Sequence, residues 1–142
     1  MNEAFLRRDR IVLTAAGARA IVDGAVRKAE EMGVPQCIAV VDEGGNLMAF
    51  ARMDGARVTS ITIAQTKAVS AATRRRPTSD EAGGDPVLGI RLSLAAGGRF
   101  TNMGGGIPIV VEGQTIGAVG VSSGTSEEDM ICGRAGLDAF DG

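Results

Sequence analysis

The sequence predicts an α+β fold in which helices pack on an antiparallel sheet. Two segments have the pattern of a β-hairpin, one over residues 36–52 and the other over residues 107–122. Helical patterns stand before, between and after them, giving the order helix, hairpin, helix, loop, hairpin, helix. Because a hairpin joins antiparallel neighbours, whereas parallel strands need a long crossover, this order favours an antiparallel sheet covered by helices.

The first helix is predicted from its N-cap, Thr14, to about Met32. Its apolar residues recur mainly at steps of three or four, so they form one stripe of an amphipathic helix. The residues of this stripe are Ala18, Ile21, Val22, Ala25, Ala29 and Met32. Gly33 and then Pro35 end the helix.

Each hairpin has two strands around a glycine-containing turn. In the first, the apolar run of Gln36–Asp42 predicts a strand covered on both faces, and Leu47–Arg52 returns beside it. In the second, Ile107–Glu112 and Gln114–Ser122 are joined at Gly113. The two hairpins supply the antiparallel pairs of the sheet.

Three further helices are predicted, over Ser60 to about Arg74, over Val87–Ala95, and over Ser126 to about Phe140. Pro77 prevents the first of these from continuing. The polar, Gly-rich segment Thr78–Asp85 is expected to be a loop.

The composition fits one domain, residues 1–142, with a core of aliphatic side chains. Hydrophobic residues make up 44% of the sequence but aromatic residues only 3%. A net charge of −2 gives no basic surface for nucleic acid or an anionic membrane, and no apolar stretch approaches the roughly 20 residues that span a bilayer. Cys37 and Cys132 suggest no disulfide framework. We therefore expect a soluble cytoplasmic protein without nucleic-acid or membrane partners.

The sequence contains no histidine. This excludes Ser–His and Cys–His nucleophile pairs, an imidazole general base, and a zinc or haem held by histidine. The two cysteines have no metal-ligand spacing, so no metal site is predicted. Acid–base chemistry would fall to Asp, Glu, Lys, Cys or water.

Four motifs follow one another along the chain. They are IAVVDEGGNLMAFARMDGA at Ile38–Ala56, IAQTKAVSAAT at Ile63–Thr73, GGGIPIV at Gly104–Val110 and GQTIGAVGVSSGTSEED at Gly113–Asp129. In this combination the chain resembles the GlcG/HbpS family, which also includes the carboxy-terminal domain of PduO-type proteins. The likeness extends from Thr14 to Phe140.

The resemblance implies a profilin-like, three-layer α/β/α sandwich around a five-stranded antiparallel sheet. It also implies homo-oligomers, and binding of haem or corrinoid-related ligands in some members. Two departures matter: some haem-binding relatives use an axial histidine, which this chain lacks, and Ser123 replaces the family's usual glycine. Both count against histidine-ligated haem and leave Thr, Met, Cys or water as iron ligands.

Lys67 is the first candidate site residue. It falls in the small-residue stripe of the second helix, beside Ile63, Ala64, Ala68 and Ala71. Its stem could lie along this stripe while the ammonium reaches solvent. Alternatively it points into a pocket and acts as a base, nucleophile or anion anchor, which the resemblance favours. We expect Lys67→Met to preserve the fold in that case.

The first hairpin and its exit supply further candidates. Asp42 is expected mainly to stabilise the turn, with a carboxylate beside the pocket as the alternative. Arg52 could clamp a carboxylate or pair with a surface acid, and Met53 is a candidate ligand contact. Asp54 precedes Gly55 and is most simply a turn residue, although it is a second candidate carboxylate for catalysis.

The second hairpin is flanked by Gly- and Ser-rich segments. Gly104, Gly105 and Gly106 precede a strand rather than a helix, so a phosphate loop is not indicated, but they could let a flat ligand approach the backbone. The acidic first turn of the last helix would repel an anion, and we expect Glu128 and Asp129 to cap that helix. Just before that helix, two hydroxyl side chains are candidate hydrogen-bonding contacts for a ligand, those of Ser122 and Ser123.

Two functions remain open from the sequence. The first is a binding protein for haem or another flat, anionic, largely apolar molecule. The second is a cofactor-independent isomerase, lyase or hydrolase that acts on a small carboxylate or carbonyl metabolite, with Lys67 as the key residue and a carboxylate as its partner. An oligomeric scaffold is the third interpretation.

Overall fold

The middle layer of the molecule is an antiparallel sheet. The computed structural model describes residues 1–79 and 85–142, and in them the strands are β1 (Cys37–Asp42), β2 (Leu47–Arg52), β3 (Gly106–Val111) and β4 (Gln114–Ser122). They lie in the order β2-β1-β4-β3. The two hairpins, β1–β2 and β3–β4, are therefore joined side by side through β1 and β4.

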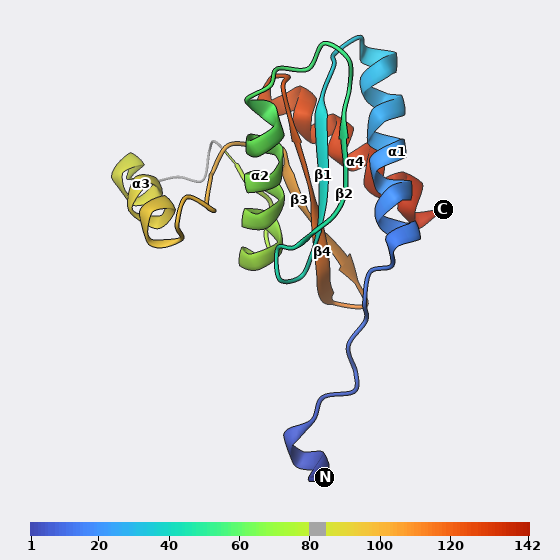
Figure 1. Cartoon of the computed structure of the whole chain (residues 1–142), viewed down its shortest axis with the longest axis vertical. Helices are drawn as coiled ribbons and strands as arrows, with labels where there is room; N and C mark the ends of the chain where they lie inside the picture. Colours follow the sequence, from blue (N-terminus) through green and yellow to red (C-terminus); the bar gives the residue numbers. More distant parts are fainter. Residues whose placement is uncertain (80–84) are drawn as a thin grey trace.

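Helices cover both faces of this sheet. The first, α1 (Ala15–Met32), packs with α4 (Ser126–Asp141) on one face, and α2 (Ser60–Arg74) covers the other (Figure 1). The short α3 (Pro86–Ala95) stands away from the sheet, and a one-turn helix, Glu3–Phe5, lies in the N-terminal arm. The expected α/β/α layering is confirmed, and the predicted strands and helices agree with these bounds to about one residue. Part of the predicted loop, residues 80–84, lies outside the described residues.

The expected five-stranded sheet was wrong, because the sheet of the described residues has four strands. The segment between α3 and β3 does not pair with an edge strand. Instead, the N–H of Thr101 donates to Oγ of Ser70 at 2.9 Å, and that hydroxyl, which donates to the carbonyl of Thr66 at 2.8 Å, also lies 3.4 Å from the carbonyl oxygen of Arg99. A side chain of α2 thus binds backbone groups of this segment.

Both faces of the sheet are buried, and β1 explains how. Along β1, Ile38 and Val40 belong to the core shared with α1 and α4, while Ala39 and Val41 belong to the core under α2. Side chains alternate between the two faces of a strand. The continuous apolar run that predicted a doubly covered strand therefore fills two cores at once.

The sandwich has two distinct ends. At the site end, β1 begins at Cys37, whose neighbours in the register are Arg52 of β2 and Ser122 of β4, and β3 begins at Gly106. The turn end carries the two hairpin turns, and the N-terminal arm leaves the body there (Figure 1). The candidate residues can be assigned to one end or the other.

Candidate functional site

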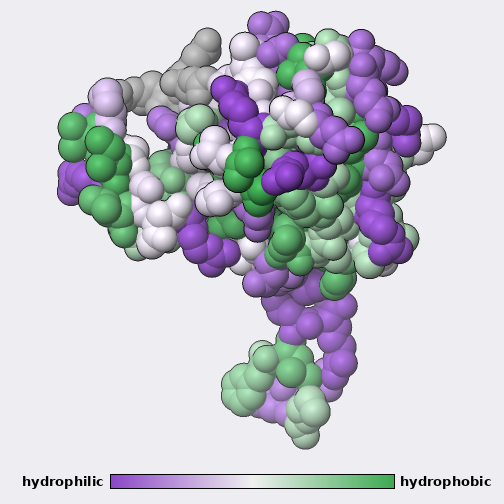
Figure 2. All heavy atoms as spheres, turned by 45° about the horizontal axis from the view of Figure 1, so that its top comes forward, coloured by the Kyte–Doolittle hydropathy of each residue, from purple (hydrophilic) through white to green (hydrophobic). Residues whose placement is uncertain are grey.

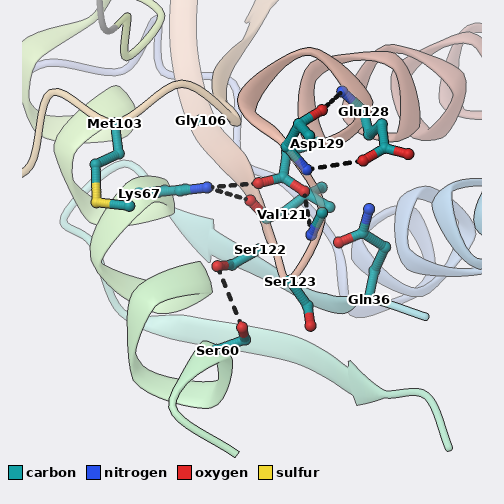
Figure 3. Close-up of polar contacts among 12 residues, drawn as sticks. Gln36, Ser60, Lys67, Met103, Gly106, Val121, Ser122, Ser123, Glu128 and Asp129 are labelled. Carbon is teal, nitrogen blue, oxygen red and sulfur yellow. Dashed lines mark hydrogen bonds and ion pairs between the residues drawn. The ribbon is translucent and has the colours of Figure 1, made fainter. Parts of the chain in front are cut away.

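A lysine and an aspartate meet in the interior near the site end. Nζ of Lys67, on α2, lies 2.7 Å from Oδ2 of Asp129, on α4, and donates a second hydrogen bond to the carbonyl of Val121 at 2.9 Å. The two charged side chains are 1% and 2% exposed and point toward each other (Figure 3). They form a buried ion pair between helices that cover opposite faces of the sheet.

The first turn of α4 explains why Asp129 points inward. Thr125 and Glu128 form a capping box, in which each residue's backbone N–H donates to the other's side chain. The expectation that Glu128 caps α4 is confirmed. The same expectation for Asp129 was wrong, because its Oδ1 accepts the N–H of Gly124, which precedes the N-cap, at 3.0 Å and its Oδ2 binds Lys67.

Burial raises the pKa of the Asp129 carboxyl above its ordinary value. The hydrogen bond and charge of Lys67, the N–H of Gly124 and the amide of Gln36 act in the opposite direction but do not cancel it. Removal from water disfavours the carboxylate, and each of these partners favours it. A carboxyl group with a raised pKa beside an ammonium group is a combination found in acid–base active sites.

Two of the three predicted glycines fit around this pair. At Gly105, whose φ is +126°, a Cβ would lie 2.5 Å from the carbonyl oxygen of Val121 and 2.9 Å from Nζ of Lys67. At Gly106, a Cβ would overlap the backbone carbonyl of Lys67. These glycines therefore serve close packing against α2 and the ion pair. Gly104 is next to Ser126, where a Cβ would lie 3.1 Å from that residue's Cβ.

Gln36 belongs to the same cluster, a role that was not predicted from the sequence. Its side chain is fully buried near the Asp129 carboxyl, whose pKa it acts to lower, and its Nε2 lies 4.0 Å from Sγ of Cys132. Its Oε1 has no hydrogen-bond partner in the described part of the chain. A glutamine at the head of an otherwise apolar strand was the available signal, because a buried amide needs partners.

An open groove of about 400 Å³ lies between α1 and the exit of β2. Its lining residues are Val26, Glu30, Ala51, Arg52, Met53 and Asp54. The structure thus brings three predicted residues together here. The guanidinium of Arg52 is exposed and has no hydrogen-bond or ion-pair partner among residues 1–79 and 85–142.

Gln36 also connects the groove to the buried pair. The carbonyl of Gln36 accepts the N–H of Met53 at 3.0 Å, and the N–H of Gln36 donates to Sδ of Met53 at 3.4 Å. On the other side, its buried side chain lies near the Asp129 carboxyl and acts to lower its pKa. The groove and the Lys67–Asp129 pair are therefore neighbours through one residue, although Lys67 does not line the groove.

The predicted serines have partners within the protein. Oγ of Ser122 lies 3.4 Å from Oγ of Ser60 at the start of α2 (Figure 3). Oγ of Ser123 accepts the N–H of Arg57 at 3.0 Å, and the carbonyl of Ser123 accepts the guanidinium of Arg57 at 2.9 Å. Neither serine lines the groove. They hold the loop before α2 against the end of β4.

Asp42 lies at the turn end, far along β1 from the other candidates. Its Oδ1 accepts the backbone N–H groups of Gly44 and Asn46, each at 2.9 Å, and both carboxylate oxygens accept the Asn46 amide. Partial burial acts to raise the pKa of Asp42, but these hydrogen bonds outweigh it and hold the pKa below its ordinary value. The geometry is the turn-stabilising one that the sequence favoured.

Two further kinds of feature are absent from residues 1–79 and 85–142. No helix there combines the length and apolar character that crossing a bilayer requires. In the same residues, no group of three or more Cys, Asp or Glu side chains is arranged to hold a metal ion.

Fold and site together define the class: a small α/β/α sandwich whose two helical layers are joined by a buried Lys–Asp pair. The sequence profile of a family described as "Haem degrading protein HbpS-like" matches residues 13–138. The chain belongs to this HbpS-like family, as its motifs indicated.

Known proteins support the assignment. Protein GlcG of Escherichia coli K12 is 36% identical over 115 residues, which cover 81% of this chain and 84% of GlcG. The crystal structure of the Klebsiella pneumoniae protein ORFY superposes with a TM-score of 0.86 at 34% identity, covering 96% of this chain and 97% of ORFY. A crystal structure of a PduOC:haem complex gives a TM-score of 0.82 at 28% identity, covering 91% and 95% of the two chains.

Proposed function

We propose that this protein binds haem, or another flat and largely apolar molecule with carboxylates at one edge, without histidine ligation. The observation that carries the proposal is the groove at the exit of β2. It combines an unpartnered guanidinium, Arg52, with the thioether of Met53 and the apolar side chains of Val26 and Ala51. Its volume of about 400 Å³ falls in the usual range for small-molecule sites.

The charges of the groove restrict how a ligand can lie in it. The guanidinium of Arg52 can bind a carboxylate through two parallel hydrogen bonds. Glu30 and Asp54 also line the groove and would repel a second carboxylate placed near them. A ligand whose negative charge is gathered at one edge therefore suits the groove better than one with anionic groups on opposite sides.

Haem fits this description, and the similarity to a PduOC:haem complex supports it. When bound, haem would supply an iron centre for redox chemistry or for binding a small ligand. Arg52 would hold a propionate, and Met53 is the sulfur donor among the groove residues. Since the chain has no histidine, a bis-imidazole spectrum is excluded.

The test is titration of apo-protein with haemin, followed by absorption, for wild type, Arg52→Gln, Met53→Leu and the control Arg134→Gln. Arg134 is an exposed arginine on α4 outside the groove. Loss of a charge-assisted hydrogen bond should weaken binding of Arg52→Gln about tenfold or more. Met53→Leu should alter the iron spectrum. Equal affinity of wild type and Arg52→Gln would refute the groove assignment.

The acid–base enzyme is the second candidate, and the Lys67–Asp129 pair favours it. A 2.7 Å contact and the raised pKa of Asp129 suit proton transfer. It ranks second because the pair is buried and does not line the groove. It predicts that turnover of a small carboxylate or carbonyl metabolite falls about 10²–10⁴-fold in Lys67→Met. If Lys67→Met loses turnover but still binds haemin, catalysis and haem binding depend on different residues.

We also infer a homo-oligomer that works in the cytoplasm. On α3, Val87, Ile90 and Leu94 are 54%, 62% and 77% exposed and follow helical spacing, so they form an apolar stripe (Figure 2). Such a stripe on so small a protein suits contact with another copy. Cys37 and Cys132 are both buried and free, which suits a reducing compartment.

A further inference from the structure

A second hollow lies at the turn end, opposite the groove at the exit of β2. It has a volume of about 560 Å³. Its walls come from the N-terminal arm, the two hairpin turns and the C-terminal end of α2. The lining residues are Arg7, Arg10, Glu43, Gly44, Ala72, Thr73, Arg75, Gly113, Gln114 and Thr115. We call this hollow the arm cleft.

Specific contacts hold the arm over this cleft. Nε2 of Gln114, the first residue of β4, donates to the carbonyl of Asp9 at 2.7 Å, and Oε1 of Gln114 accepts the N–H of Ile11 at 3.0 Å. The guanidinium of Arg10 forms an ion pair with Glu43 in the β1–β2 turn. The arm is therefore attached to both hairpin turns, and its arginines are held beside the body.

The arm cleft is positively charged. Three guanidinium groups line it against one carboxylate, that of Glu43, which already pairs with Arg10. Arg75 has no hydrogen-bond or ion-pair partner for its side chain within the described ranges, and its backbone is left-handed with φ of +59° at the end of α2. Arg7 pairs with Asp9 at the surface, where such pairs contribute little and exchange readily.

One contribution opposes an anion here. The C-terminal end of α2 carries the partial negative charge of the helix dipole, equivalent to about half an elementary charge. The full positive charge of Arg75, whose side chain has no partner in the described ranges, exceeds it, and Arg7 adds a second guanidinium when its surface pair with Asp9 exchanges. The hydroxyl of Thr115 and the backbone at Gly113 add polar groups to the same wall.

We propose that the arm cleft binds a small polyanion, a molecule with two or more phosphate or carboxylate groups. A guanidinium binds either group through paired hydrogen bonds, and arginines from three separate segments can engage several groups at once. The volume is within the range for small-molecule sites. The proposal is independent of haem binding, since none of the cleft residues lines the groove.

The test is calorimetric titration of the full chain with pyrophosphate and, separately, with citrate, at constant ionic strength. The variants are Arg75→Gln and a matched control, Arg76→Gln, which removes the next charge in the chain but lies outside the cleft. We expect saturable binding by wild type and Arg76→Gln, and affinity about tenfold lower or more for Arg75→Gln. The probe that binds with the higher affinity shows whether the cleft prefers phosphate or carboxylate groups.

A third variant tests whether the position of the N-terminal arm contributes to binding. Gln114→Ala retains every charge but removes the two hydrogen bonds that hold the arm. Binding should weaken in it as well. The proposal is overturned if wild type binds neither probe at millimolar concentration, if Arg75→Gln binds as wild type does, or if Arg76→Gln loses as much affinity as Arg75→Gln.

Discussion

The buried ion pair makes Lys67 important for stability, whatever its further role. Replacing Lys67 by Met leaves the Asp129 carboxyl buried without its cation. Breaking a buried pair on one side costs about 3–5 kcal/mol. We therefore expect Lys67→Met to be destabilised by about this amount in urea unfolding at pH 8, instead of tolerating the change as expected for a pocket lysine.

The double variant Lys67→Met/Asp129→Asn is the control for that experiment. The neutral amide that replaces the carboxylate can still accept from Gly124, so the double variant should recover most of the lost stability. The single variant should also regain stability as the pH falls, because its carboxyl, whose pKa burial already raises, takes up a proton. A single variant as stable as wild type at pH 8 would argue against an ionised pair.

Asp42 gives a pH dependence of the opposite sign. Its folded-state pKa lies below the ordinary value of 3.8, so its ionised form stabilises the turn above that pH. This contribution is lost as the pH falls through the folded-state pKa. Asp42→Asn should therefore be less stable than wild type at pH 7, by roughly 0.5–1 kcal/mol, with the gap closing as the pH falls through the lowered folded-state pKa. A gap that stays constant as the solution is acidified from neutral pH through this range would contradict the assignment.

For single residues, the sequence predicted where a side chain lies better than it predicted which residues that side chain contacts. The spacing of Lys67 beside Ala64, Ala68 and Ala71 correctly indicated the buried side of its helix, because helical periodicity is local information. Its partner Asp129 belongs to another helix beyond both strands of the second hairpin, and no local pattern connects them. Gln36 was missed for the same reason, since its polar partners come from distant segments.

Glycines in β3 and β4 let helix α2 pack directly against the backbone of the sheet. At Gly120 of β4 a Cβ would overlap the backbone carbonyl of Ala64, and at Gly106 of β3 it would overlap that of Lys67. We expect Gly120→Ala to cost about 1–3 kcal/mol of unfolding free energy, because α2 must move away from the strands. Urea denaturation measures this cost directly.

Gly89 of α3 supplies the matched control. Its nearest neighbour, Asn102, lies 3.7 Å from the position of an added Cβ, which is ordinary contact distance. Gly89→Ala should be neutral or stabilising by about 0.5–1 kcal/mol, since alanine favours a helix. If Gly120→Ala and Gly89→Ala lose the same stability, the cost at Gly120 does not come from the close packing of α2.

The elements themselves could be predicted because their signals are local. The caps at Thr14 and Thr125, the glycine at the end of α1 and the hairpin turns all lie within a few residues of the boundaries they set. The number of strands could not be obtained in this way. It was carried over from relatives, whereas strand pairing depends on contacts between segments far apart in the sequence, and the sheet of the described residues has four strands.

For the whole molecule, the apolar stripe of α3 predicts association. A ten-residue helix that is exposed and apolar gains little stability alone in water, and contact with another copy would remove Val87, Ile90 and Leu94 from solvent. We expect sedimentation equilibrium at micromolar concentration to give at least twice the 14.5 kDa mass of the chain. A mass of one chain over the whole concentration range would contradict it.

The strand order β2-β1-β4-β3 also governs how the chain reaches its fold. Each hairpin closes over a short turn, but the central β1–β4 pair forms only after the intervening α2, α3 and β3 have been looped out. Loop closure of that length is entropically costly, so the hairpins should form first and dock afterwards. In pulsed hydrogen exchange during refolding, amides of the hairpin ladders should gain protection before those of the β1–β4 ladder. The seam at the centre of the sheet therefore forms late, and the Lys67–Asp129 pair, which joins both helical layers, can close only after it.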